Sequence, residues 1–177
     1  MPRSSRSNSI SVNRLSRALP KGPIRKNRPC ARTPRSPVVL RFRAVRDLVF
    51  FYGTLMAGFD RRRRAGIDDK LTYIGRGSIQ GALFDLGLYP AAVPAPDGHI
   101  WGEVYEMSEP VPVLAALDEI EGYRHDDPDR SLYRREQADV VLPDASHAPA
   151  WTYFYNAPLG RAPRIVSGDY LEHVKVR

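Results

Sequence analysis

The chain has 177 residues, enough for one domain of ordinary size or for a smaller domain with a tail. Residues 1–46 contain thirteen Lys and Arg and no acidic residue, whereas residues 47–177 contain 14 basic and 20 acidic residues, a formal charge of −6. The net charge of +7 therefore belongs to the tail, which argues against nucleic-acid binding by the part that can fold.

Residues 1–46 are predicted to be a disordered extension rich in Arg, Ser and Pro, and residues 47–177 a single domain. Three roles fit the extension: a transit-like targeting peptide, a basic arm that touches anionic partners, or coding sequence upstream of the true start. The composition changes sharply at Asp47, so we favour a dispensable or misassigned extension. Its Cys30 is the chain's one cysteine, which excludes an intrachain disulfide and a thiolate metal cluster.

No apolar run approaches the roughly 20 residues that span a bilayer, and Arg and Ser interrupt every short apolar group near the N-terminus. We therefore expect a cytoplasmic protein with no membrane segment and no signal peptide.

The stretch from Leu48 to Tyr52 is apolar and aromatic, and it ends at Gly53-Thr54. This pattern predicts a buried strand that opens into a tight turn. Glycine permits a positive φ and leaves no Cβ in the way of a ligand, so the N–H groups of residues 52–55 can converge on a carboxylate or an oxyanion. An ordinary strand and turn is the alternative, because so short a motif often matches by chance.

The segment from Met56 to Leu71 is strongly charged and is expected to form short helix and loop. It contains the run Arg61–Arg64, which favours a solvated face over a phosphate-binding patch because Asp60, Asp68 and Asp69 lie close enough to neutralise it. We assign this run no site.

Strands are predicted next. The first strand is predicted over Tyr73–Leu86, which contains glycines of the kind that bulges and barrel bends require. Tyr89 follows in a second strand-to-turn junction, where it is either a packing residue or part of a pocket wall. The further predicted strands are Trp101–Met107, Arg134–Leu142 and Ala150–Asn156. Several antiparallel strands with one clear helix indicate a small closed or nearly closed barrel.

The helix is predicted over Pro110–Glu121, with Ser108 as N-cap and Gly122 as the stop. At about 100° per residue, Glu121 lies on the apolar stripe, about 20° from Leu114. A carboxylate there must be paired, hydrogen-bonded or line a cavity. A structural salt bridge to Arg134 or Arg135 is one interpretation. A cavity, in which burial raises the pKa of Glu121 towards the range of proton transfer, is the other.

Seven short motifs occur in order across residues 47–177. They are Tyr52-Gly53-Thr54-Leu55, Leu88-Tyr89-Pro90-Ala91, Gly102-Glu103-Val104-Tyr105, Leu117-Asp118-x-x-Glu121-Gly122-Tyr123, Tyr133-Arg134-Arg135, Trp151-x-Tyr153-x-Tyr155 and Ser167-Gly168-Asp169-Tyr170. In this order and spacing the chain resembles the γ-glutamylcyclotransferase-like family, in particular its γ-glutamylamine cyclotransferase and AIG2-like branch. Tyr170 stands where many relatives have Trp, a change expected to affect packing more than chemistry.

The resemblance implies an α+β fold, a small mixed and mostly antiparallel β-barrel flanked by short helices, with one cavity whose mouth is the turn at residues 52–55. It implies release of 5-oxoproline from a γ-glutamyl compound without a metal or another cofactor. The family's essential glutamate corresponds to Glu121. The spacings of the four histidines match no metal-binding motif, so they give no reason to expect a metal site.

The predicted site therefore has Glu121 as acid and base, and Gly53, Thr54 and Leu55 as N–H donors to the substrate. Pocket walls are assigned to Tyr52, Tyr89 and Tyr155. The expected partner is a small γ-glutamyl substrate. Two alternatives remain: a tailoring enzyme that removes a γ-glutamyl protecting group, and a non-catalytic module that binds an acidic small molecule.

Overall fold

The computed structural model describes residues 46–176. The predicted extension lies outside the described residues except for Arg46, and the predicted domain boundary stays a prediction. No helix in the described part of the chain is long and apolar enough to cross a membrane.

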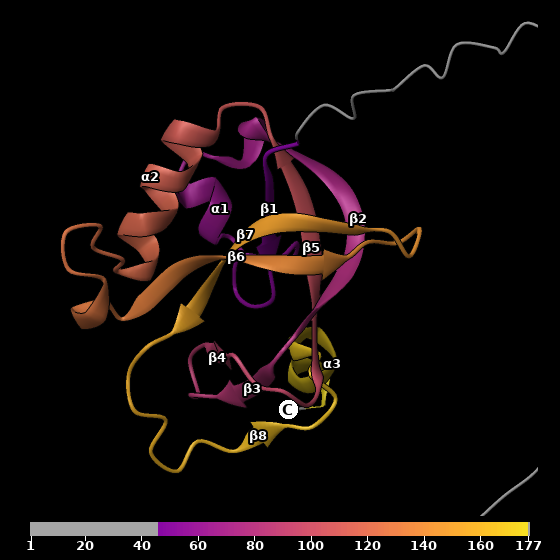
Figure 1. Cartoon of the computed structure of the whole chain (residues 1–177), viewed down its shortest axis with the longest axis vertical. Coiled ribbons are helices and arrows are strands. Elements are labelled where there is room, and N and C mark those ends of the chain that lie inside the picture. The colour runs from indigo at the N-terminus through magenta and orange to yellow at the C-terminus, as the bar shows by residue number, and fades with distance from the viewer. Residues whose placement is uncertain (1–45, 177) are drawn as a thin grey trace, which may run out of the picture. The chain divides into compact units, whose positions relative to one another are not determined.

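Five strands form a closed barrel in the order β1-β5-β2-β6-β7 (Figure 1). Their bounds are β1 Leu48–Phe51, β2 Leu71–Gln80, β5 His99–Met107, β6 Tyr133–Val141 and β7 His147–Tyr155. The barrel closes through a parallel pairing of Val49 in β1 with Trp151 in β7, while the other pairings are antiparallel. The expected small, mixed and mostly antiparallel barrel is confirmed.

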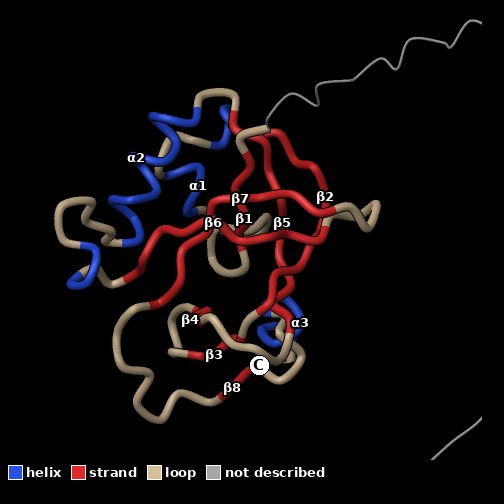
Figure 2. The backbone as a smooth tube through the Cα atoms, viewed as in Figure 1, coloured by secondary structure: helices blue, strands red, loops and turns tan. Residues whose placement is uncertain are grey.

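A second sheet of three strands has the order β4-β3-β8. Its strands are β3 Ala82–Asp85, β4 Pro90–Val93 and β8 Arg164–Ile165. The helices are α1 Arg61–Arg64, α2 Pro110–Glu121 and α3 Tyr170–Lys175, with 3₁₀ turns at Asp68–Lys70 and Pro128–Arg130 (Figure 2). Short helices therefore flank the strands, as expected.

The strand predicted over Tyr73–Leu86 is two strands, because the chain breaks at Gly81. This residue has φ 155°, and a Cβ there would lie 2.9 Å from the carbonyl oxygen of Val93. Glycine thus lets the chain leave the barrel as β2 and enter the small sheet as β3. The bulge predicted among these glycines is present, since the register between β2 and β5 shifts between Tyr73 and Gly75.

Helix α2 has the predicted bounds, and its end is a backbone feature: Gly122 adopts the left-handed conformation, with φ 63°. The predicted N-cap is wrong. The capping position is Glu109, whose side chain makes no capping bond, and the Ser108 hydroxyl instead donates to the carbonyl of Lys70. Pro110 can begin the helix without the loss of a hydrogen bond, because the first N–H groups of a helix have no acceptor within the helix.

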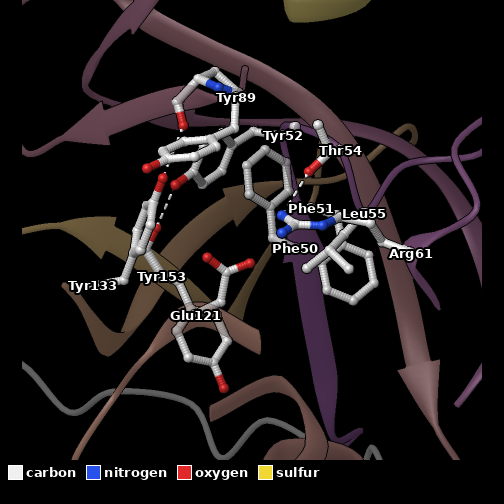
Figure 3. Close-up of a pocket in the computed structure, with 12 residues that line it drawn as sticks. Phe50, Phe51, Tyr52, Thr54, Leu55, Arg61, Tyr89, Glu121, Tyr133 and Tyr153 are labelled. Carbon is white, nitrogen blue, oxygen red and sulfur yellow. Dashed lines mark hydrogen bonds between the residues drawn. The ribbon is translucent and has the colours of Figure 1, made fainter. Parts of the chain in front are cut away.

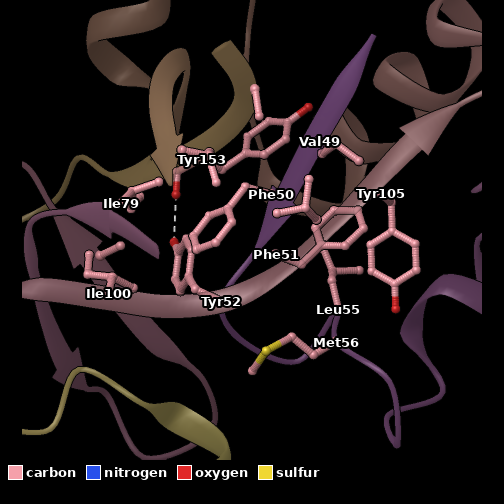
Figure 4. Packing of buried hydrophobic residues seen from close by; sticks show 14 of the residues in the cluster. Val49, Phe50, Phe51, Tyr52, Leu55, Met56, Ile79, Ile100, Tyr105 and Tyr153 are labelled. Carbon is pink, nitrogen blue, oxygen red and sulfur yellow. Dashed lines mark hydrogen bonds between the residues drawn. The ribbon is translucent and has the colours of Figure 1, made fainter. Parts of the chain in front are cut away.

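Strand β1 is buried at every position, which explains why its sequence is a continuous apolar run rather than an alternating one (Figure 4). Phe50 is 1% exposed, and burying such a side chain contributes about 1.5–3 kcal/mol. Tyr52 at the end of this strand remains in the core, its hydroxyl donating to the carbonyl of Tyr153 at 2.6 Å. The strand thereby holds the turn that follows it against the barrel.

Candidate active site

A pocket opens where β1 ends (Figure 3). Its interior is narrow, about 30 Å³, within about 370 Å³ of empty space that continues into solvent. The lining residues come from β1 and its turn, from α1, α2, β4, β6 and β7, and from the loop before β4. They are Phe50, Phe51, Tyr52, Gly53, Thr54, Leu55, Arg61, Tyr89, Pro90, Glu121, Tyr133 and Tyr153. Among these described residues, Glu121 is the one carboxylate and Arg61 the one cation.

Gly53 is needed in the turn for a reason other than the one predicted. It is not among the glycines with positive φ, so the expected left-handed backbone is wrong. A Cβ at this position would instead lie 2.7 Å from Cγ of Pro90, closer than real Cβ contacts occur. Glycine therefore allows the turn after β1 to approach the start of β4, which brings both into one pocket wall.

The turn after β1 is closed by one backbone hydrogen bond and leaves three N–H groups without a partner among the described residues. The N–H of Met56 donates to the carbonyl of Gly53 at 2.9 Å and closes the turn. Within the described part of the chain, the N–H groups of Gly53, Thr54 and Leu55 have no hydrogen-bond acceptor. Because unpaired backbone donors on a pocket wall bind anions, this arrangement suits a carboxylate or an oxyanion.

Glu121 is the last residue of α2, and its carboxylate points into the pocket (Figure 3). The predicted salt-bridge alternative does not hold. Arg135 pairs with Asp118 at 2.7 Å and Arg134 with Glu136 at 3.5 Å. Burial raises the pKa of Glu121 to about 7, and the charge of Arg61 opposes that rise. The carboxyl group can thus exchange a proton near neutral pH.

Asp118 fixes the last turn of α2, one helical turn before Glu121. Its carboxylate accepts a hydrogen bond from Arg135 at 2.7 Å and another from the hydroxyl of Tyr153 at 2.6 Å. These partners lie in β6 and β7. The network therefore holds the end of the helix against the barrel and sets where Glu121 enters the pocket.

Four tyrosines line the pocket: Tyr52, Tyr89, Tyr133 and Tyr153. Burial raises the pKa of Tyr52 and of Tyr133 well above the usual value, so both hydroxyls stay protonated. The Tyr133 hydroxyl donates to the carbonyl of Pro90 at 3.1 Å. Tyr155 does not line the pocket. Its ring packs edge-on against Tyr133, with centroids 5.2 Å apart, so it supports the wall from behind.

The run of four arginines, which was assigned no site, separates into different roles. Arg62 is buried over the ring of Tyr105, 4.4 Å from its centroid, and lies 3.4 Å from an Asp68 oxygen. Arg63 and Arg64 are exposed. Arg61 alone of the run lines the pocket, where its guanidinium donates to the Thr54 hydroxyl at 3.1 Å (Figure 3). The sequence does not single out Arg61, because the four residues of the run are identical. Only the orientation of the short helix α1 determines which of them lines the pocket.

A family model and a relative in another organism indicate the same family for this chain. A family model described as "Gamma-glutamyl cyclotransferase, AIG2-like" matches residues 49–172. The Gamma-glutamylcyclotransferase family protein YtfP of Escherichia coli K12 is 31% identical over 131 residues, which cover 72% of this chain and 98% of that protein.

Two solved structures resemble the fold. YkqA from Bacillus subtilis has a TM-score of 0.55 at 27% identity, covering 74% of this chain and 42% of that one, so this chain spans less than half of YkqA. An AIG2-like protein from Mus musculus has a TM-score of 0.55 at 22% identity, covering 71% of this chain and 88% of that one. The second likeness concerns the fold alone.

Proposed function

This chain belongs to the AIG2-like γ-glutamyl cyclotransferase family, and from that premise we propose that it releases 5-oxoproline and a free amine from γ-glutamyl amines or other γ-glutamyl amino compounds. One observation carries the proposal: a carboxyl group with a raised pKa and a turn with unpaired N–H groups line the same narrow pocket. A proton acceptor and an anion site are the two parts that this reaction requires.

The reaction is intramolecular. The α-ammonium of the substrate gives a proton to the Glu121 carboxylate, and the resulting amine attacks the γ-carbonyl carbon to form a C–N bond and close a five-membered ring. The neutral Glu121 then protonates the departing nitrogen as the original amide C–N bond breaks. The remaining surplus proton of the ring nitrogen passes by the same carboxyl group to the leaving amine. The products are 5-oxoproline and an ammonium ion, and Glu121 ends as a carboxylate.

The pocket's main task is to fold the substrate. An extended γ-glutamyl chain reacts slowly with itself, and holding its ends together removes much of the entropic barrier. The N–H groups of Gly53, Thr54 and Leu55 would hold the substrate α-carboxylate or the developing oxyanion. Tyr52, Tyr89 and Tyr133 would form walls of the site around the glutamyl part.

The first prediction concerns Glu121. We expect Glu121→Gln to fold as the wild type does and to lose about 100-fold or more of its turnover, because Gln neither accepts nor returns the proton. The measurement is 5-oxoproline released from a panel of γ-glutamyl amines and peptides, followed by chromatography.

Glu172→Gln is the matched control, since Glu172 is an exposed residue of α3 that does not line the pocket. Normal turnover by the Glu121 variant would remove the mechanism. No 5-oxoproline from any member of the panel with the wild-type chain would contradict the proposed activity and favour a module that binds an acidic small molecule.

A further inference from the structure

The tyrosine hydroxyls of the pocket differ in whether they already have an acceptor. Three of them donate to fixed groups, namely Tyr52 to the carbonyl of Tyr153 at 2.6 Å, Tyr133 to the carbonyl of Pro90 at 3.1 Å and Tyr153 to the carboxylate of Asp118 at 2.6 Å. The hydroxyl of Tyr89 has no hydrogen-bond partner among the described residues. Because a phenol hydroxyl carries one proton to donate, Tyr89 is the tyrosine of this pocket that can offer a hydrogen bond to a substrate.

The backbone that carries Tyr89 is held firmly. Tyr89 lies in the hairpin that joins β3 to β4, and its carbonyl accepts a hydrogen bond from the N–H of Leu86 at 3.1 Å. At the base of the hairpin, the buried Asp85 carboxylate accepts a hydrogen bond from the N–H of Gly87 at 2.7 Å. The same carboxylate lies 2.9 Å from Nε2 of His173 in α3. These contacts fix the point at which the Tyr89 side chain leaves the chain.

The residue after Tyr89 joins the hairpin to the pocket wall. Pro90 lies so close to Gly53 that a Cβ there would be 2.7 Å from its Cγ, and its carbonyl accepts the Tyr133 hydroxyl bond. The ring of Tyr89 lies on the same side of the pocket as that of Tyr133, with centroids 6.5 Å apart (Figure 3). Tyr89 is therefore fixed in position while its hydroxyl stays unpaired. A donor arranged in this way can stabilise a charge as it develops, because nothing has to reorganise.

The chemistry of a γ-glutamyl substrate shows which atom needs this donor. The reacting part has four polar groups: the α-ammonium, the scissile nitrogen, the α-carboxylate and the γ-carbonyl oxygen. In the mechanism proposed above, Glu121 exchanges protons with the two nitrogens. The unpaired N–H groups of residues 53–55 belong to one turn and suit one anion.

The two oxygen groups of the substrate cannot share that turn. In the five-membered ring that forms, the α-carboxylate and the γ-carbonyl oxygen are carried on opposite sides of the ring nitrogen. The α-carboxylate bears a full charge throughout the reaction, so three backbone donors suit it. The γ-carbonyl oxygen becomes charged only when the amine attacks, and it requires a separate donor.

We propose that the Tyr89 hydroxyl donates a hydrogen bond to the γ-carbonyl oxygen and stabilises the oxyanion that develops there. Tyr89 is then a catalytic residue, and the N–H groups of residues 53–55 bind the α-carboxylate. This inference rests on the proposed function.

The test is Tyr89→Phe in the full chain, which removes the hydroxyl and keeps the ring. The substrate is the one turned over fastest in a panel that includes γ-glutamylethylamine and γ-glutamylalanine. We expect kcat to fall about 100-fold and KM to change less than about threefold, because the hydrogen bond strengthens as the oxygen becomes charged. The urea midpoint should stay at the wild-type value, since the hydroxyl has no partner in the described structure to lose.

Tyr73→Phe is the matched control. Tyr73 in β2 is 53% exposed and does not line the pocket, so this variant should keep the wild-type kcat and KM. An unchanged kcat in Tyr89→Phe would overturn the inference, whether or not KM rises, because a hydroxyl that acts on the oxyanion must affect the chemical step. In that case the wild type would still release 5-oxoproline and the proposed function would stand. If the wild type releases none from any member of the panel, the proposed function fails and this inference with it.

Discussion

At the scale of single residues, Glu121 combines a cost to folding with a use in catalysis. Its carboxyl group lies in the pocket without an ion pair to Arg134 or Arg135, which pair with Glu136 and Asp118. Burial therefore raises its pKa to about 7 instead of being offset by a close cation. A residue that only stabilised the fold would be better served by a partner or by an apolar side chain. The unpaired arrangement is what a group that exchanges protons near neutral pH requires.

The second prediction follows from that raised pKa. The folded chain holds the Glu121 proton up to about pH 7, whereas the unfolded chain releases it near its ordinary value of 4.5. The folded state then binds more protons between these values, so the contribution of Glu121 to stability is present below about pH 4.5 and is lost as the pH rises through about 7. The loss amounts to at most about 3 kcal/mol.

Urea unfolding of the wild type and of Glu121→Gln at pH 4.5, 6 and 8 measures this effect, because Gln does not titrate and all other groups are shared. We expect the wild type to lose stability relative to the variant over this range. A difference between the two that is independent of pH would show that Glu121 has an ordinary pKa.

At the scale of elements, the site depends on how α2 and the turn after β1 are fixed to the barrel. Close approach to Pro90 fixes the turn, and it is possible only because residue 53 is glycine. The Asp118 carboxylate fixes the end of α2 through Arg135 in β6 and Tyr153 in β7. The carbonyl of Tyr153 also accepts a hydrogen bond from the Tyr52 hydroxyl. Tyr153 therefore supports both the end of the helix and the turn.

The third prediction tests that support. We expect Asp118→Asn to lower the free energy of unfolding by about 1–3 kcal/mol, because the largely buried Arg135 loses its charged partner. Turnover should also fall, since the last turn of α2 is less firmly held and Glu121 is displaced from the reacting atoms. Urea unfolding and 5-oxoproline release measure the two effects.

Arg134→Gln is the control for this pair. The side chains of Arg134 and Glu136 are 45% and 42% exposed, so their ion pair contributes less than about 1 kcal/mol and its loss should leave stability and turnover near the wild type. Equal effects of Asp118→Asn and Arg134→Gln would mean that the Asp118 network does not hold α2 in place.

At the scale of the whole described molecule, the pocket is assembled from segments far apart in the chain. The barrel supplies β1 and its turn, the small sheet supplies Pro90, and α2 supplies Glu121. The Tyr133 hydroxyl bond to the carbonyl of Pro90 joins the barrel to the small sheet at the pocket wall. The site therefore exists only when both sheets and the helix are folded together.

The fourth prediction concerns the domain boundary, which rests on composition. We expect a chain that begins at residue 46 to unfold at the same urea midpoint as the full chain and to release 5-oxoproline at the same rate, because the described core and pocket lie within residues 46–176. Loss of stability or of turnover on truncation would contradict the view of residues 1–46 as a dispensable extension.

Local patterns in the sequence were sufficient for the elements with strong periodic or turn signals. The bounds of α2 follow from Pro110 and Gly122, and the position of Glu121 on the apolar stripe follows from helical periodicity. The barrel was expected from several strands with interrupting glycines, and the family from motifs in order. These features are predictable because their causes lie within a few residues of one another.

Only the tertiary structure decided the features whose causes are distant in the chain. Residue 53 must be glycine because the turn approaches Pro90, and residue 81 must be glycine because the chain approaches the carbonyl oxygen of Val93. Tyr155 lies behind the pocket wall because its ring packs against Tyr133. Arg61 lines the pocket, whereas Arg62 packs on Tyr105 and the next two arginines reach Asp60, although all four are the same residue. Local sequence determines which way a side chain leaves its own element, but what that side chain meets depends on where the other elements pack.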